Sequence, residues 1–189
     1  SWRTPDSVKI IPHNGGYYAE FNTSNFGEFW FSKGNIAPPY ASSCQSGLIT
    51  FNAPTGASTY QWQLNTGSGY NNITDGATYS GTTSASLLVF NMPTSSTGNK
   101  YRCLVNGSAG TEYTLRFKTL WTGTSNTNWF NAANWECGVV PDQYTDVIIP
   151  SGLTNYPVLT VDASVRSIRV LNNAPVTINT GIKLTVTGK

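Results

Sequence analysis

The chain has 189 residues, with 11 basic and 9 acidic side chains and a single histidine. Charged residues make up 11% of it, against roughly 25% in average globular proteins, and 25 Thr, 19 Ser and 19 Asn take their place. Aromatic residues reach 13%, which excludes the disordered class, poor in aromatic and β-branched residues. Abundant Thr, Val and Tyr between Gly and Asn turns predict an all-β protein.

Composition and motif content exclude several classes of function. No apolar run approaches the ~18 residues that a membrane-spanning helix needs. A net charge of +2, dispersed along the chain, is too weak for an electrostatic nucleic-acid binder. No Cys and His spacing fits a zinc site, and no Gly-rich phosphate loop precedes a helix pattern. We therefore expect no membrane span, no nucleic-acid partner and no cofactor.

The first segment, residues 1–36, carries three short apolar pieces at Val8–Ile11, Tyr17–Phe21 and Phe26–Phe31. Turn signals rich in Gly and Asn divide these pieces. Two or three strands are too few to bury a core in water. We interpret this segment as the last strands of a preceding β-sandwich domain.

The second segment, residues 37–118, begins at a Pro-Pro junction and shows the two-residue period of half-buried strands. Its strand candidates are separated by turn-rich stretches, as in a β-sandwich. They are residues 47–52, 59–64, 86–91, 100–106 and 111–117.

Three residues narrow the fold of this segment. Trp62 stands where the tryptophan of strand C would lie, and Tyr101 stands two residues before Cys103 in the tyrosine-corner arrangement. Together they resemble an immunoglobulin-like domain. The usual cysteine of strand B is absent, and Cys44 lies seven residues before Phe51. Two alternatives stay open: a Cys44–Cys103 disulfide, or a buried free thiol at Cys103 that behaves as a small hydrophobe.

The third segment, residues 119–189, opens with three tryptophans and continues with short strand candidates. Its last three apolar pairs recur every eight residues with Asn and Gly corners between them, which predicts coils of a β-solenoid. A small antiparallel sandwich is the alternative. The first coil of a solenoid needs a cap, and we expect Trp121, Trp129 and Trp135 to form it. The strand candidates are residues 146–149, 158–161, 167–171, 176–179 and 183–187.

The motifs of this third segment resemble a module of very large Bacteroidota surface proteins that are exported by type IX secretion. The matching motifs are Trp121-Thr-Gly, Asn128-Trp129, Asn134-Trp135, Asp146-Val-Ile-Ile-Pro150 and Leu184-Thr-Val-Thr-Gly188. The second segment is similar to immunoglobulin-like modules of such proteins through Tyr60-Gln-Trp-Gln63 and Tyr101-Arg-Cys103. The resemblance implies a secreted or cell-surface multidomain protein of adhesin type, located outside the cell.

The resemblance carries two further expectations. In similar third modules a cysteine like Cys137 pairs with a second one near Val165, and because that partner is absent here we expect Cys137 to be a free thiol. Asp6-Ser7-Val8 is similar to the O-glycosylation pattern of Bacteroidota secreted proteins, which makes Ser7 a candidate modification site. The sorting domain expected of this export route is missing from the sequence, so we expect either a fragment of a longer chain or a chain from which the sorting domain was removed.

The sequence contains no catalytic constellation. His13 lies in a Pro-His-Asn-Gly-Gly turn, where an exposed turn residue is the expected role rather than that of a triad base. The closest pair of carboxylates, Asp142 and Asp146, is expected to cap turns. We predict that the protein is not an enzyme and holds no metal.

Four tyrosines in predicted turns, Tyr70, Tyr79, Tyr144 and Tyr156, are candidates for stacking on sugar rings. The alternative, which we prefer, is that they fold back on the domain edges. The preferred function is a non-catalytic structural or adhesive segment of a surface protein. Its partners would be neighbouring domains of the same chain, and surface polysaccharide or another cell-surface protein. A carbohydrate-binding module of a secreted enzyme and a self-assembling extracellular fibre subunit are the alternatives.

Overall fold

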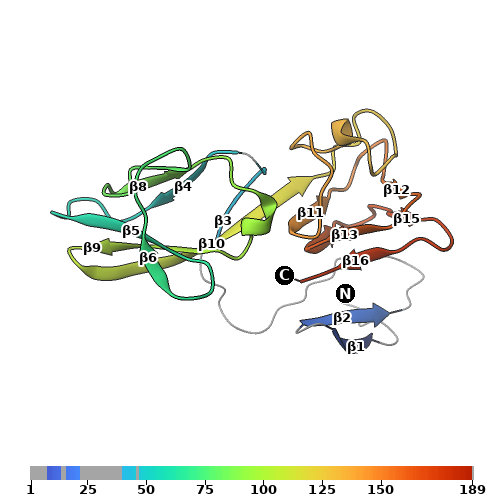
Figure 1. Ribbon diagram of the computed structural model, residues 1–189. Coiled ribbons are helices and arrows are strands. Elements are labelled where there is room, and N and C mark those ends of the chain that lie inside the picture. The colour runs from blue at the N-terminus through green and yellow to red at the C-terminus, as the bar shows by residue number, and fades with distance from the viewer. Residues whose placement is uncertain (1–7, 14–15, 22–39, 46, 189) are drawn as a thin grey trace. The chain divides into compact units, whose positions relative to one another are not determined.

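The computed structural model describes residues 8–13, 16–21, 40–45 and 47–188 (Figure 1). These residues form sixteen strands and two three-residue 3-10 helices, η1 (Thr94–Ser96) and η2 (Ala132–Asn134). The all-β prediction is confirmed. Within the described residues no helix is long and apolar enough to cross a membrane. Ser7 and the expected strand at Phe26–Phe31 lie outside the described residues.

The chain divides into two compact units. One consists of Ser32–Lys118, and the other combines Ser1–Phe31 with Thr119–Lys189. Near the N-terminus, β1 (Val8–His13) and β2 (Gly16–Phe21) pair in antiparallel register, with His13 opposite Gly16. This hairpin covers two of the three pieces expected in the first segment.

The unit Ser32–Lys118 is built from two sheets. Three short strands form the first sheet in the order β4-β8-β7: β4 (Ile49–Asn52), β8 (Ser86–Val89) and β7 (Tyr79–Ser80). The second sheet runs in the order β6-β5-β9-β10, and β3 pairs with β10 in parallel. Its strands are β3 (Tyr40–Ser43), β5 (Tyr60–Asn65), β6 (Tyr70–Asn72), β9 (Lys100–Val105) and β10 (Ser108–Leu120).

An aromatic core fills the space between these two sheets. Phe51 from β4 stacks on Tyr101 from β9 with ring centroids 4.7 Å apart, and Trp62 lies 6.2 Å from Phe51. Trp62 and Tyr101 are both fully buried. The alternation of buried and exposed positions along β4 fits the predicted two-residue period. The Tyr101 hydroxyl lies 3.5 Å from the Tyr79 hydroxyl, and burial raises the pKa of Tyr101.

Of the two alternatives left open for Cys103, the buried free thiol is confirmed and the Cys44–Cys103 disulfide is wrong. The geometry of the sheet explains why. Ser43 pairs with Phe117 on β10, whereas Cys103 lies against Gly110, where an added Cβ would be 3.1 Å from the Cys103 carbonyl oxygen. These two levels of β10 are about 20 Å apart at ~3.3 Å per residue, and a disulfide needs Cα atoms within ~7 Å. Cys44 is disulfide-bonded.

Parallel strand pairs build the part of the second unit that begins at Thr119, which we call the C-terminal unit. β11 (Thr145–Ile149) pairs with β14 (Ser167–Val170), β12 (Val158–Leu159) with β15 (Thr177–Ile178), and β13 (Ala163–Val165) with β16 (Leu184–Val186). Paired residues lie 21, 19 and 21 positions apart in the sequence, as Asp146–Ser167, Val158–Thr177 and Ala163–Leu184. The eight-residue spacing seen in the sequence therefore separates consecutive strands, and roughly twenty residues separate stacked ones. The three pairings are parallel, so the antiparallel alternative is wrong for these strands.

The three tryptophans lie together in the core of this unit. The rings of Trp121 and Trp129 each meet the ring of Trp135 edge to face, at centroid distances of 5.0 and 4.8 Å. Trp121 Nε1 donates to the carbonyl of Asn155 at 2.8 Å, and Trp135 Nε1 donates to the carbonyl of Trp129 at 2.8 Å. All three side chains are at most 2% exposed.

Cys137 follows this cluster and is disulfide-bonded. The predicted free thiol at this position is therefore wrong. The prediction followed from the resemblance, which places the partner near Val165, where this sequence has no cysteine.

Candidate functional site

The four candidate tyrosines lie in separate environments. Tyr79 packs on the core of its unit and meets Tyr101 edge to face at 6.3 Å. Tyr156 packs on the C-terminal core, and its hydroxyl accepts a hydrogen bond from the Leu153 amide at 3.2 Å. Tyr144 is half-buried in a turn, where its backbone amide donates to Asp142 at 3.0 Å. Tyr79 and Tyr156 therefore fold back on the protein, as the preferred alternative predicted.

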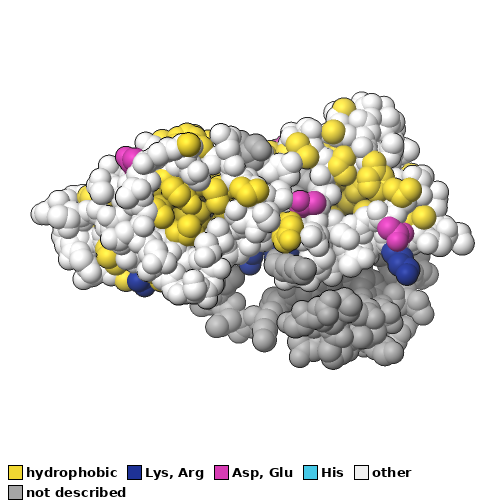
Figure 2. Space-filling view, in the orientation of Figure 1, with side chains coloured by type: hydrophobic (Ala, Val, Ile, Leu, Met, Phe, Trp, Pro, Cys, Tyr) yellow, Lys and Arg dark blue, Asp and Glu magenta, His cyan; other side chains and the backbone are white. Residues whose placement is uncertain are grey.

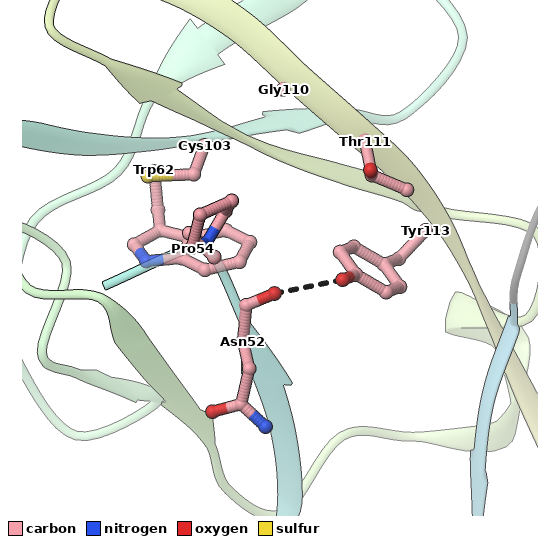
Figure 3. Close-up of a pocket in the computed structure, with 8 residues that line it drawn as sticks. Asn52, Pro54, Trp62, Cys103, Gly110, Thr111 and Tyr113 are labelled. Carbon is pink, nitrogen blue, oxygen red and sulfur yellow. Dashed lines mark hydrogen bonds between the residues drawn. The ribbon is translucent and has the colours of Figure 1, made fainter. Parts of the chain in front are cut away.

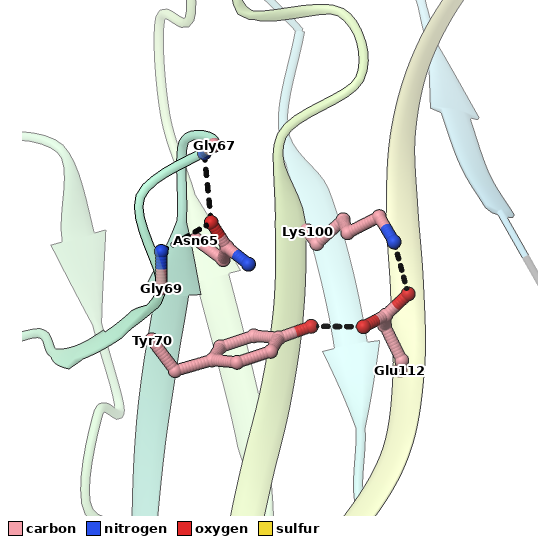
Figure 4. Close-up of polar contacts among 6 residues, drawn as sticks. All are labelled: Asn65, Gly67, Gly69, Tyr70, Lys100 and Glu112. Atoms are coloured by element: carbon pink, nitrogen blue, oxygen red, sulfur yellow. Dashed lines mark hydrogen bonds and ion pairs between the residues drawn. The ribbon is translucent and has the colours of Figure 1, made fainter.

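Tyr70 is different, because its side chain lies on the solvent side of a sheet. Its hydroxyl donates a short hydrogen bond to Glu112, and Glu112 also forms an ion pair with Lys100 at 2.8 Å (Figure 4). The guanidinium carbon of Arg102 lies 3.8 Å from the centre of the Tyr70 ring, within the range of a cation–π contact. Three strands thus bring four side chains together that are far apart in sequence.

These side chains point away from the core because strand residues alternate between the two faces of a sheet. Trp62 and Cys103 face the core, so their neighbours Gln63 and Arg102 face solvent. Strand register then aligns a row across four strands, in which Asn72 is opposite Gln63, Gln63 opposite Arg102, and Arg102 opposite Glu112. We call the outward side chains of this row, together with Tyr70 and Lys100, the polar face.

Hydrogen bonds run along the polar face from strand to strand. Gln63 donates through Nε2 to Asn72 Oδ1 at 2.8 Å and accepts through Oε1 from Arg102 Nε at 2.8 Å. Since Gln63 uses both ends of its amide, its orientation is fixed by its two neighbours. The turn that precedes β6 is closed by Asn65, whose Oδ1 accepts from the amides of Gly67 and Gly69 (Figure 4).

The electrostatics of the polar face favour a charged Glu112 and a neutral Tyr70. Burial, followed by the hydrogen bond to Glu112, raises the pKa of Tyr70 to about 12. The hydrogen bonds from Lys100 and Tyr70 lower the pKa of Glu112. Across physiological pH the face therefore carries two positive charges and one negative charge.

A small cavity lies on the other side of the same sheet. Its lining includes Asn52, Pro54, Trp62, Cys103 and Tyr113, and its volume of about 20 Å³ suits a single water molecule (Figure 3). The Tyr113 hydroxyl donates to the Asn52 carbonyl oxygen at 2.7 Å at the edge of this space. Burial raises the pKa of Cys103, so the thiol is held in its unreactive protonated form. The cavity is too small for a substrate.

Carboxylates elsewhere serve the fold. Asp142 accepts from the Tyr144 amide and the Thr145 hydroxyl, as expected of a turn cap. Asp146 accepts from Ser167 and pairs with Arg166 at 2.5 Å, which ties β11 to β14. The cap expected at Asp146 is thus replaced by a link between stacked strands. Among the described residues no group of three His, Cys, Asp or Glu side chains could hold a metal ion.

The candidate site residues predicted from the sequence did not include Arg102, Glu112, Gln63 or Lys100. Their outward orientation could have been predicted from the two-residue period of the strands, because residues that alternate with Trp62 and Cys103 lie on the opposite face of the sheet. Strand register was the missing information, since only register shows that these positions share one row.

Comparison with known protein families gives a match for the C-terminal unit. Residues 120–189 match the model of a domain of unknown function, DUF8693, so this unit is similar to that domain. The match begins one residue after Thr119, the start of the C-terminal unit, which is the second of the two segments of its compact unit. No curated protein matches the chain.

Proposed function

We propose that the chain is a non-catalytic structural and adhesive segment of a large secreted or cell-surface protein. In this proposal residues 37–118 are an immunoglobulin-like sandwich and residues 119–189 are a β-solenoid module. The two facing sheets, with Trp62 opposite Cys103 in register, support the first assignment. The three parallel pairings about twenty residues apart support the second, because stacked coils of a solenoid pair in this way.

The proposal that the chain is non-catalytic rests on the contacts of its carboxylate side chains. Side chains are described for six of the nine acidic residues, and five of them are held by structural partners. Asp75 binds Thr82, Asp162 binds the Lys183 amide, and the other three are Glu112, Asp142 and Asp146. A glycosidase would need two carboxylates converging on one cleft, and these are bound at separate places in strands and turns.

Glu136 is the sixth of these carboxylates and is not among the five with the structural contacts named above. Its substitution therefore gives the sharpest test of the proposal. The purified chain should release no product from a panel of polysaccharide and peptide substrates, and Glu136→Gln should behave as the wild type. Turnover that disappears in Glu136→Gln or in Asp142→Asn, while the amide NMR spectrum stays native, would overturn the proposal.

The polar face favours a carbohydrate-binding role as a second candidate. Sugar hydroxyls exchange hydrogen bonds with amide and charged side chains, and Asn72, Gln63 and Arg102 offer a fixed row of them. Stacking of a sugar on Tyr70 is less favoured, because the Arg102 guanidinium already covers one face of this ring. A test is saturable binding of a soluble polysaccharide that is lost in Gln63→Ala and kept in Tyr156→Phe.

A further inference from the structure

Arg102 has donors that the fold does not use. Its Nε donates to Gln63 at 2.8 Å, and its guanidinium carbon lies 3.8 Å from the centre of the Tyr70 ring. In the part of the chain that the structure describes, no acceptor is bound by its two terminal Nη groups. A guanidinium carries five N–H donors in one plane, so up to four of them are available to a ligand.

The two contacts of Arg102 fix its orientation and leave its outer edge open. The Tyr70 ring covers a face of the guanidinium, and Gln63 occupies the Nε corner. A carboxylate binds in the guanidinium plane, through two parallel hydrogen bonds along an edge. Since the side chain is already held, a ligand would immobilise little further rotamer freedom on binding.

The charge balance on the polar face also favours an anionic group. Lys100 and Glu112 neutralise each other at 2.8 Å, so the charge of Arg102 has no hydrogen-bonded counter-ion in the face. Charged side chains are few on the face in view in Figure 2, and they are only 11% of the chain. Within the described residues of the polar face, Arg102 is thus an oriented guanidinium without a hydrogen-bonded counter-ion.

We propose that Arg102 recognises the carboxylate groups of an acidic polysaccharide, with Gln63 and Asn72 binding neighbouring sugar hydroxyls. This inference rests on the adhesive role proposed above and names the class of ligand. A protein partner would call for a buried apolar or aromatic anchor at the centre of its contact, whereas the cross-strand row consists of Asn72, Gln63, Arg102 and Glu112. An extended chain of uronic acids can lie across such a flat row and present a carboxylate on each sugar.

The test is calorimetric titration of the full chain with three soluble probes at low ionic strength. Polygalacturonate carries the carboxylates, its fully methyl-esterified form is the neutral control, and poly-glutamate presents carboxylates on a peptide. We expect polygalacturonate to bind, and binding to weaken about tenfold or more in Arg102→Gln, because a bidentate charged pair is lost. Arg102→Lys should recover only part of this loss, since an ammonium lacks the planar fork.

Lys183→Gln is the matched control, because it removes the same charge from an exposed position outside the polar face. Its affinity for polygalacturonate should equal that of the wild type, and the amide NMR spectrum of Arg102→Gln should remain native. Equal binding by Arg102→Gln, or equal binding of the methyl ester, overturns the inference while leaving an adhesive role through another surface. Tighter binding of poly-glutamate overturns the choice of a polysaccharide. Absence of binding to all three probes overturns it as well.

Discussion

Asn134 shows how much one buried amide contributes to the C-terminal unit. It is fully buried, and its Oδ1 accepts from the amides of Ser125 and Asn126 at 2.9 and 3.0 Å. Its Nδ2 donates to Asn126 Oδ1 at 2.8 Å and to the Asn128 carbonyl at 3.0 Å. All four hydrogen-bonding positions of the side chain are used, so the loop before η2 is closed around this one residue.

We predict that Asn134→Ala lowers the free energy of unfolding of the C-terminal unit by about 2–4 kcal/mol. Removing the amide leaves buried backbone donors and a carbonyl without partners, and each such group costs ~1–3 kcal/mol. Urea unfolding followed by tryptophan fluorescence measures the change. Asn172→Ala, at an exposed position of the same unit, should change stability by less than ~0.5 kcal/mol. Equal effects of the two substitutions would contradict the role of Asn134.

Tyr70 gives a prediction at alkaline pH. Its pKa in the folded protein is raised to about 12 from the ordinary tyrosine value of 10.0, so the folded state keeps its proton where the unfolded state loses it. The stabilisation is complete below pH ~10 and is lost as the pH rises from there toward 12. An NMR titration of the Tyr70 ring should give a midpoint near 12. In Glu112→Gln the midpoint should fall, because the carboxylate that accepts the hydrogen bond is gone, but it should stay above 10.0, because burial is the larger cause of the raised pKa. An unchanged midpoint would argue against the hydrogen bond.

Two glycines in loops, Gly123 and Gly152, both have positive φ, but only one of them would also clash with the protein if it carried a side chain. Gly123 has φ +59, and a Cβ added there would lie 2.2 Å from the Asn155 carbonyl oxygen. Gly152 has φ +77, and a Cβ added there meets nothing within 4 Å. Both positions therefore favour glycine for its backbone, but only Gly123 lacks room for a side chain.

Gly152→Ala is expected to cost about 1–2 kcal/mol of unfolding free energy, the usual strain of a left-handed alanine. Gly123→Ala should cost at least ~2 kcal/mol more, because the added Cβ clashes with the backbone carbonyl of Asn155, which must then be displaced. Chemical denaturation of the two variants under the same conditions measures the difference. Similar losses for both would show that the Asn155 loop moves aside freely.

Sequence patterns located most strands but not their partners. The period-two runs at Tyr60–Asn65 and Lys100–Val105 were found because alternation is visible in one strand alone. The strands Tyr40–Ser43 and Ala163–Val165 were missed, because four and three residues are too few to establish a period, and their position depends on pairing with a sequence-distant strand. The polar face depends on register, and for that reason it could not be predicted from composition or spacing.

For the molecule as a whole, the two cores have no residue in common. Leu87 belongs to the core of the unit Ser32–Lys118 and Val165 to that of the C-terminal unit, and both are fully buried. Each side chain contributes ~1.5–3 kcal/mol through apolar burial. Truncation of either side chain leaves a cavity in its own core and so destabilises the unit to which that core belongs.

Native-state hydrogen exchange should separate the two cores. Leu87→Ala is expected to reduce amide protection in β5, β8 and β9 by about 2–5 kcal/mol, with little change in β11 and β14. Val165→Ala should reduce protection in β11 and β14, by a smaller amount because fewer methyl groups are removed, and leave β5 and β9 unchanged. Equal losses in both units from either variant would show that the chain opens as one cooperative body.

The three parallel strand pairs of the C-terminal unit and the β3–β10 pair differ in how many residues separate the paired strands along the chain. Stacked strands of the C-terminal unit are 19 to 21 residues apart, whereas Tyr40 on β3 meets Thr114 on β10, about 74 residues later. Closing a loop costs more entropy as it lengthens, and non-local pairing slows folding. During synthesis, β3 must wait for nearly its whole unit to emerge before it finds its partner. Until then, its open edge is the part of the nascent chain most in need of protection from wrong pairing.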